Sequence, residues 1–94
     1  MVDRELIEFA AKACGMWDHK NGCIDKPWSP LTDDGDALRL AVKLNLLVDV
    51  SSRYGHTEAG PAAGYQCEMH CGDPYAATRR AIVRAAAEVG KAMP

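Results

Sequence analysis

The chain has 94 residues, of which 48% are hydrophobic and 26% are charged. These values are typical of a folded globular protein, and they exclude a disordered chain or a fibrous repeat. A chain of this length fills one hydrophobic core, so we expect a single domain over residues 1–94. Lys and Arg number 11 and Asp and Glu number 13, so the net charge is −2, which gives no overall attraction to nucleic acid or to an anionic membrane.

The sequence also predicts the compartment. Its longest strictly aliphatic run, Leu46 to Val48, is far shorter than the roughly 20 apolar residues of a membrane helix. Charged residues interrupt the apolar pattern at the start, so it does not resemble a signal peptide. We expect a cytoplasmic protein with no membrane partner. Its four cysteines could form two disulfides in three pairings, but in the cytoplasm we expect reduced and mostly buried thiols.

The first part of the chain predicts a helix and a hairpin. Residues 3–14 place apolar side chains on one helical face, and Gly15 is a natural stop because it can adopt the left-handed conformation. Asn21-Gly22 suits a tight turn, so we expect two short strands, at 16–19 and 23–26.

A second helix is expected over residues 33–44. Thr32 or Asp33 can cap its first turn, and the acidic cluster that follows complements the positive end of the helix dipole. Asn45 is a plausible cap at its other end. One predicted apolar face, with Leu40 and Leu44 beside it, contains Leu38, Ala41, Val42 and Asn45.

The last part of the chain predicts two more strands and a long helix. Residues 46–51 and 65–70 alternate with period two, and the Gly- and Pro-rich stretch 52–64 between them reads as a long, flexible connection. Asp73 and Pro74 are typical of a helix start, which predicts a helix over 75–92. Four of its basic side chains are expected to face outward, namely Arg79, Arg80, Arg84 and Lys91.

This order, α-β-β-α-β-β-α, predicts an α+β domain with a mainly antiparallel four-stranded sheet, because consecutive strands joined by short turns usually pair. Two tracts then carry a family likeness. Trp28–Leu44 and Arg79–Met93 resemble the phage ABA sandwich domain family, a set of small proteins encoded by tailed bacteriophages and prophages, and residues 3–15 resemble the family's opening helix.

The resemblance implies a three-layer α/β/α sandwich and a phage or prophage origin. It implies no activity, and it carries no catalytic residues to this chain. The family often has Trp-Asn-Pro where this chain has Trp28-Ser29-Pro30, a change that keeps a turn-forming side chain. The cysteines and histidines lie outside the matching tracts, so any chemistry built on them would be peculiar to this protein.

The densest group of metal-ligating residue types is Cys67-Glu-Met-His70-Cys71. Zinc knuckles place cysteines two to four residues apart on a tight turn. On a strand, however, Cys67 and Cys71 would stand about 13 Å apart, at roughly 3.3 Å per residue. They could share an ion with His70 only if the segment turns there. A zinc-stabilised protein using Cys67, His70 and Cys71 is therefore one alternative, and no metal or other cofactor is the expectation.

The basic last helix is the second alternative. Residues 75–93 carry four basic residues and one acid, for a net charge of +3. Arg80 and Arg84 stand four residues apart and could contact phosphates, which would make this a nucleic-acid-binding protein. The first 36 residues, with eight acids and four basic residues, could instead neutralise the helix. We favour a solvated or salt-bridged face over a nucleic-acid partner.

For catalysis, the sequence shows no local signature of an activated nucleophile and no phosphate-binding glycine loop. We therefore expect a non-enzymatic accessory protein that binds another protein and forms a small homo-oligomer. We expect no catalytic, cofactor-binding or metal-binding residues.

Overall fold

The computed structural model describes residues 2–18, 20–24, 27–51, 55–61 and 64–93. Over these residues the chain is an α+β protein with three helices and a three-stranded antiparallel sheet, so the predicted fold class is confirmed at that level. In chain order the elements are α1 Asp3–Cys14, β1 Trp17–Asp18, β2 Cys23–Ile24, α2 Asp34–Lys43, β3 Leu47–Ser51, β4 His56–Gly60, β5 Gln66–Met69 and α3 Pro74–Lys91.

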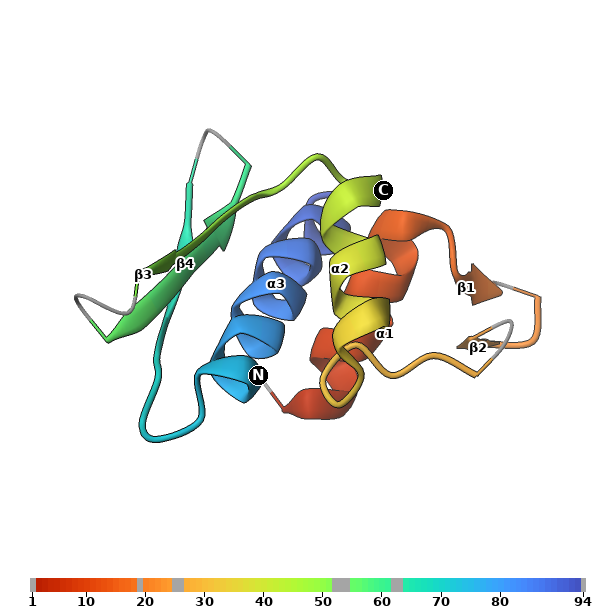
Figure 1. Cartoon of the computed structure of the whole chain (residues 1–94). Helices are drawn as coiled ribbons and strands as arrows, with labels where there is room; N and C mark the ends of the chain where they lie inside the picture. Colours follow the sequence, from red (N-terminus) through yellow and green to blue (C-terminus); the bar gives the residue numbers. More distant parts are fainter. Residues whose placement is uncertain (1, 19, 25–26, 52–54, 62–63, 94) are drawn as a thin grey trace.

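Helix α3 is the centre of the molecule. It packs against α1 and α2 on one side and against β4 and β5 on the other. Figure 1 shows the sheet, α3 and the α1/α2 pair as successive layers, with the β1–β2 hairpin at the far end. The predicted helix over 75–92 is confirmed in extent, but it is more deeply buried than a helix with one apolar stripe would be.

Small side chains let α1 and α3 approach closely. Ala10 and Ala11 of α1 are fully buried, as are Ala81, Ala86 and Ala87 of α3. At the end of α3, Gly90 lies so close to α1 that a Cβ atom built on it would stand 1.9 Å from the carbonyl oxygen of Phe9. We call this contact the α1–α3 seam. It has no room for even one more methyl group.

The helix boundaries follow the predicted signals. Gly15 ends α1 in the left-handed conformation, with φ 81°, and its N–H bonds to the carbonyls of the last turn. The Asp33 carboxylate accepts the N–H of Asp36 at the start of α2. The Asp73 carboxylate accepts the N–H of Ala76 at the start of α3. These three ends were predicted from residue type alone.

The predicted long connection over 52–64 is wrong in its middle, because residues 56–60 form strand β4. This strand lies between β3 and β5, pairing Asp49 with Glu58 and Glu58 with Cys67. Its inward side chains, Thr57 and Ala59, are small and fully buried. They are small because α3 lies directly over them, and without large apolar side chains the segment shows no apolar alternation in the sequence.

The predicted single sheet of four strands is not confirmed, because the described strands form one sheet of two strands and one of three. Within the described residues, β1 and β2 pair only with each other, Trp17 with Ile24 and Asp18 with Cys23. The turn is longer than predicted, because four residues separate these strands and the N–H of Gly22 returns to the carbonyl of Asp18. Residues 19, 25 and 26 of the predicted strands lie outside the described residues. The hairpin contacts α1 and extends the molecule away from the main sheet.

The α/β/α layering is not confirmed. In Figure 1, α1, α2 and α3 all lie on the same side of the main sheet. On the opposite side, Leu47 and Met69 are 56% and 60% exposed. The layers of the described structure are therefore sheet, helix and helix.

Candidate functional site

An apolar groove lies between α2 and β3, with the first turns of α3 as its floor. Its volume is about 610 Å³, within the size range of ligand and partner sites. We call it the α2/β3 groove. Its lining residues come from all three elements and the turn before α3, namely Asp34, Ala37, Leu38, Val48, Val50, His70, Pro74, Tyr75, Thr78, Arg79 and Ile82.

Large apolar side chains stand exposed around this groove. Leu38 and Val42 of α2 are 63% and 68% exposed, Val50 of β3 is 53% exposed, and Tyr75 of α3 is 70% exposed. Leu38 and Val42 are four residues apart, so they form a ridge along one side of α2. An extended apolar surface of this kind is typical of an interaction site.

This ridge corrects the predicted apolar face of the second helix. The residues of α2 that are buried are Ala37, Leu40 and Ala41, whereas Leu38 and Val42 point away from the core. The helix is apolar on two sides, and α3 covers only one of them. The excess of apolar residues in the sequence was the signal that could have indicated the groove.

Polar groups at the base of the groove are bonded to one another. The hydroxyl of Thr57 shares hydrogen bonds of 2.9 Å with the Nε2 atom of His70 and with the hydroxyl of Thr78. Thr57 is completely buried, so it cannot reach a substrate. These bonds connect the sheet to the start of α3 and fix the floor of the groove.

The four basic residues of α3 are in ion pairs, which agrees with the salt-bridged face that we favoured over a nucleic-acid partner. Arg79 bonds to Asp34 at 2.6 Å and to the carbonyl of Leu31 at 2.8 Å, and its side chain is only 17% exposed. Arg80 bonds to Asp3 at 2.8 Å, and its Nε atom lies 3.9 Å from Glu68.

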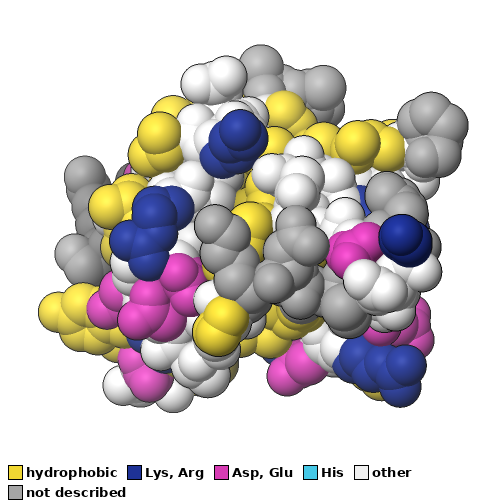
Figure 2. Space-filling view, turned by 90° about the vertical axis from the view of Figure 1, so that its right-hand side faces the viewer, with side chains coloured by type: hydrophobic (Ala, Val, Ile, Leu, Met, Phe, Trp, Pro, Cys, Tyr) yellow, Lys and Arg dark blue, Asp and Glu magenta, His cyan; other side chains and the backbone are white. Residues whose placement is uncertain are grey.

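Arg84 also bonds to Glu68 and donates to the carbonyl of Cys67 at 3.1 Å, so two arginines share one glutamate of the sheet. Lys91 lies 3.8 Å from Glu88. The arginines therefore connect α3 to the elements that surround it, which leaves less support for a nucleic-acid interface. On the face shown in Figure 2, Lys and Arg side chains lie among acidic and apolar ones.

The three side chains predicted as possible zinc ligands lie in different surroundings. Cys67 is exposed on β5, Cys71 is exposed in the turn that follows, and the His70 ring bonds to Thr57. Within the described residues, no three Cys, His, Asp or Glu side chains form a group that could hold a metal ion. The expectation of mostly buried cysteines is wrong for Cys67 and Cys71, because they lie on the open sheet face and in a turn.

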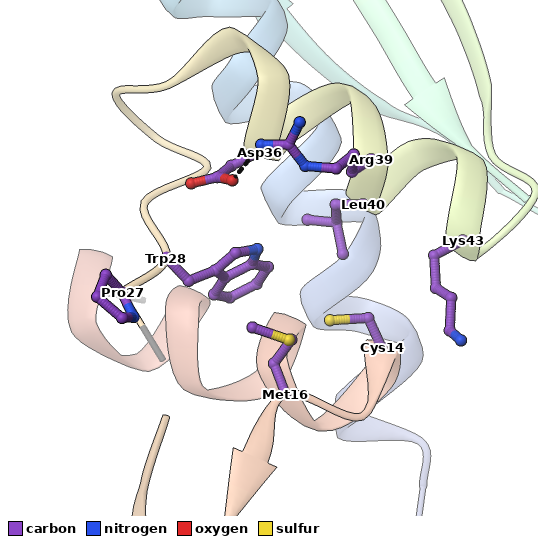
Figure 3. A pocket seen from close by; sticks show the side chains of 8 residues that line it. All are labelled: Cys14, Met16, Pro27, Trp28, Asp36, Arg39, Leu40 and Lys43. Atoms are coloured by element: carbon purple, nitrogen blue, oxygen red, sulfur yellow. Dashed lines mark hydrogen bonds and ion pairs between the residues drawn. The ribbon is translucent and has the colours of Figure 1, made fainter. Parts of the chain in front are cut away.

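A second, smaller hollow lies on the other side of α2, between α2 and the end of α1. Its volume is about 370 Å³. We call it the Trp28 hollow, because Figure 3 shows the indole of Trp28 at its centre, with Met16 and Cys14 below and Leu40 above. Its lining residues are Cys14, Met16, Pro27, Trp28, Asp36, Arg39, Leu40 and Lys43.

The charged side chains that line the Trp28 hollow differ in whether they have an ion-pair partner. The Asp36 carboxylate accepts the N–H of Ser29 at 2.9 Å and the guanidinium of Arg39 at 2.7 Å, and these bonds hold its pKa below the ordinary value. Arg39 also lies 3.8 Å from Asp33. In the part of the chain that the structure describes, the ammonium of Lys43 has no ion-pair partner.

The thiol of Cys14 is half-buried at the base of this hollow. Burial raises its pKa above the ordinary value, and its bond to the carbonyl of Ala11, at 3.7 Å, is a weak one. At neutral pH the sulfur is therefore a protonated thiol, which is a poor nucleophile. The hollow has the features of a binding site and lacks an activated cysteine.

Compared with known proteins, the chain matches no family model, no curated protein and no solved structure. The resemblance to the phage ABA sandwich family therefore stays a prediction. Among the helices in the described residues, none has the length and apolar character needed to cross a membrane.

Proposed function

We propose that this protein is a non-enzymatic interaction protein that pairs with a second copy of itself through the α2/β3 groove. The observation that carries the proposal is the exposed ridge of Leu38 and Val42 beside an apolar groove on the same face. On its inner side α2 is buried at Ala37, Leu40 and Ala41, so this ridge is not the product of a loose helix.

A ridge next to a groove is self-complementary. A two-fold axis through this face brings the ridge of each copy into the groove of the other, and such isologous contacts are the commonest arrangement in homodimers. The same face would be less suited to a chain of repeated copies, because both halves of the contact are used in one pairing.

The exposed area is of a suitable size. Covering the exposed parts of Leu38, Val42, Val50 and Tyr75 would remove roughly 450 Å² of apolar surface from each copy. A standard interface buries about 800 Å² on each partner. The groove walls and the neighbouring backbone of β3 would have to supply the remaining area.

The position of β3 favours the same pairing. Within the described residues it is an edge strand of the sheet, because its pairing partner there is β4. Its sequence, Leu-Val-Asp-Val-Ser, has no lysine or proline to prevent contact with another chain, and its one charged residue, Asp49, lies on the opposite face from Val48 and Val50. A second copy that covers the groove would protect this edge as well.

The arrangement of reactive groups supports a non-enzymatic role. The hydroxyl of Thr57 is hydrogen-bonded to the imidazole of His70. Thr57 is completely buried, so a substrate cannot reach this hydroxyl. Cys14 holds a protonated thiol that bonds to a backbone carbonyl. Neither group combines access with activation, which catalysis by a nucleophile requires.

We also propose that the protein is a phage or prophage accessory protein that works in the host cytoplasm. The support is the resemblance of Trp28–Leu44 and Arg79–Met93 to the phage ABA sandwich family. In a host that carries the gene in a prophage, its transcript should rise together with known phage transcripts after induction. A transcript level that does not change on induction would contradict this origin.

The test of self-pairing is light scattering after size exclusion, over a wide range of protein concentration. We expect the wild type to be a dimer that dissociates on dilution. Val42→Glu should weaken the dimer by about a hundredfold or more, because it would bury an unpaired carboxylate. The fold should persist, since Val42 is 68% exposed in the single chain.

Met69→Glu is the matched control. Met69 is 60% exposed, nearly as much as Val42, but it lies on the other face of the sheet. This variant should dimerise like the wild type. A wild type that is monomeric at every concentration contradicts the proposal, as does a Val42→Glu variant with unchanged dimerisation. If the wild type is monomeric and binds a different protein through this face, the occupant of the groove is that protein and not a second copy.

A further inference from the structure

We infer that the Trp28 hollow is a binding site for a small carboxylate with a flat, apolar body. This inference is independent of self-pairing, because the hollow lies on the other side of α2 from the α2/β3 groove. Two observations carry it: the walls of the hollow are largely apolar, and one charged side chain that lines it, Lys43, has no ion-pair partner within the described residues.

The walls suit a flat apolar group. The indole of Trp28 offers a broad face, and Met16 and Leu40 surround it (Figure 3). Methionine is unbranched and adapts to the shape of a ligand. The volume of about 370 Å³ lies in the range of small-molecule sites and is too small for a partner helix.

The walls are also held in place by the fold. Leu40 is almost completely buried, and Trp28 packs against the hydrophobic core. The N–H of Ser29, next to Trp28, bonds to Asp36 of α2. The hollow is therefore formed before a ligand arrives, so little binding energy is lost to ordering the protein.

The charges select a negative ligand. Among the charged residues that line the hollow, Arg39 is paired with Asp36, so the remaining charge is the ammonium of Lys43. Lys43 is exposed at the end of α2, and Figure 3 shows its side chain directed away from Trp28. Its long flexible stem allows the ammonium to turn toward a bound anion.

The indole N–H of Trp28 is a second donor. It makes no hydrogen bond within the described residues, and it is not a buried unsatisfied group, so it stays accessible. A carboxylate at the rim can accept from both groups while its apolar body covers the indole. A positively charged or purely apolar ligand would leave Lys43 without a partner.

The experiment uses 1-naphthoate as the probe and 1-naphthalenemethanol as its neutral counterpart. Binding is measured by calorimetry, and the rate at which iodoacetamide modifies each cysteine is followed by mass spectrometry. We expect 1-naphthoate to bind more tightly than the alcohol. It should slow the modification of Cys14, which lines the hollow, and leave Cys67 and Cys71 unchanged, because they are exposed elsewhere.

Lys43→Gln should weaken 1-naphthoate by about threefold to fivefold, which is the range of a partly exposed ion pair, and leave the alcohol unchanged. Lys91→Gln is the control, since Lys91 is an exposed lysine at the end of another helix. The inference is overturned if the alcohol binds as tightly as the carboxylate, if Lys43→Gln has no effect, or if Cys14 is not protected. Binding that persists in the monomeric Val42→Glu variant separates this site from the dimer contact.

Discussion

The α1–α3 seam and the outer side of α2 are opposite ways of using apolar residues. In the seam the side chains are small, and the two backbones are nearly in contact at Gly90 and Phe9. On the outer side of α2 the side chains are large, and Leu38 and Val42 contact little else in the chain. The seam holds one chain together, whereas the outer side of α2 is suited to contact with a second chain. Substitutions in the two regions should therefore affect different properties.

The largest effect on stability is expected in the seam. Gly90→Ala should lower the free energy of unfolding by about 1–3 kcal/mol, because the new methyl group would meet the carbonyl oxygen of Phe9. Helix propensity alone would raise stability by about 1 kcal/mol, so the sign of the change separates the two explanations.

Urea denaturation of the Gly90→Ala variant measures this effect, with Glu88→Ala as the control. Glu88 is an exposed residue of the same helix, and its replacement should change stability by less than about 0.5 kcal/mol. A Gly90→Ala variant that is more stable than the wild type would show that the seam is not closely packed.

The attachment of α2 to α3 should be intermediate in strength. Arg79→Gln removes the ion pair to Asp34 and the bond to the carbonyl of Leu31, and should cost about 1–2 kcal/mol. Lys91→Gln removes an exposed pair and should cost less than about 0.5 kcal/mol. Equal losses in the two variants, measured by urea denaturation, would mean that Arg79 is a surface charge rather than a bond between helices.

The smallest effect is expected at Asp36, between α2 and Trp28. Its pKa is lowered in the folded state by the N–H of Ser29 and then by Arg39. Its contribution to stability is therefore present above the ordinary aspartate value of about 3.9 and is lost as the pH falls through the folded value. Asp36→Asn should be less stable than the wild type at pH 7, and the difference should shrink below about pH 4. If the difference in stability between Asp36→Asn and the wild type does not change with pH, ionisation of the Asp36 carboxylate is not its cause.

The sequence predicted the helices well because their signals are local. Gly15, Asp33 and Asp73 end or begin helices through bonds to residues at most four positions away. The strand β4 was missed because it depends on distant contacts. Its inner residues, Thr57 and Ala59, are small enough to fit under α3, so the segment lacks the large apolar side chains that indicate a buried strand face.

The candidate sites were harder to predict than the helices. The exposure of Leu38 and Val42 depends on which side of α2 meets α3, and helical spacing alone does not determine this. A solvated or salt-bridged face was expected for the arginines of α3, but their individual partners, such as Asp3 and Glu68, could not be named because they are far away in the sequence. Helical periodicity identifies a polar side chain, but it does not show what that side chain contacts.

The central claim is that the outer side of α2 is an interface between copies of this chain. It is tested most directly by methyl NMR spectra recorded over a dilution series. If this side of α2 is the interface, resonances of Leu38, Val42 and Val50 shift as the dimer dissociates, while those of Leu47, on the other face of the sheet, stay in place. Spectra that do not change with concentration, or changes confined to Leu47, would contradict it.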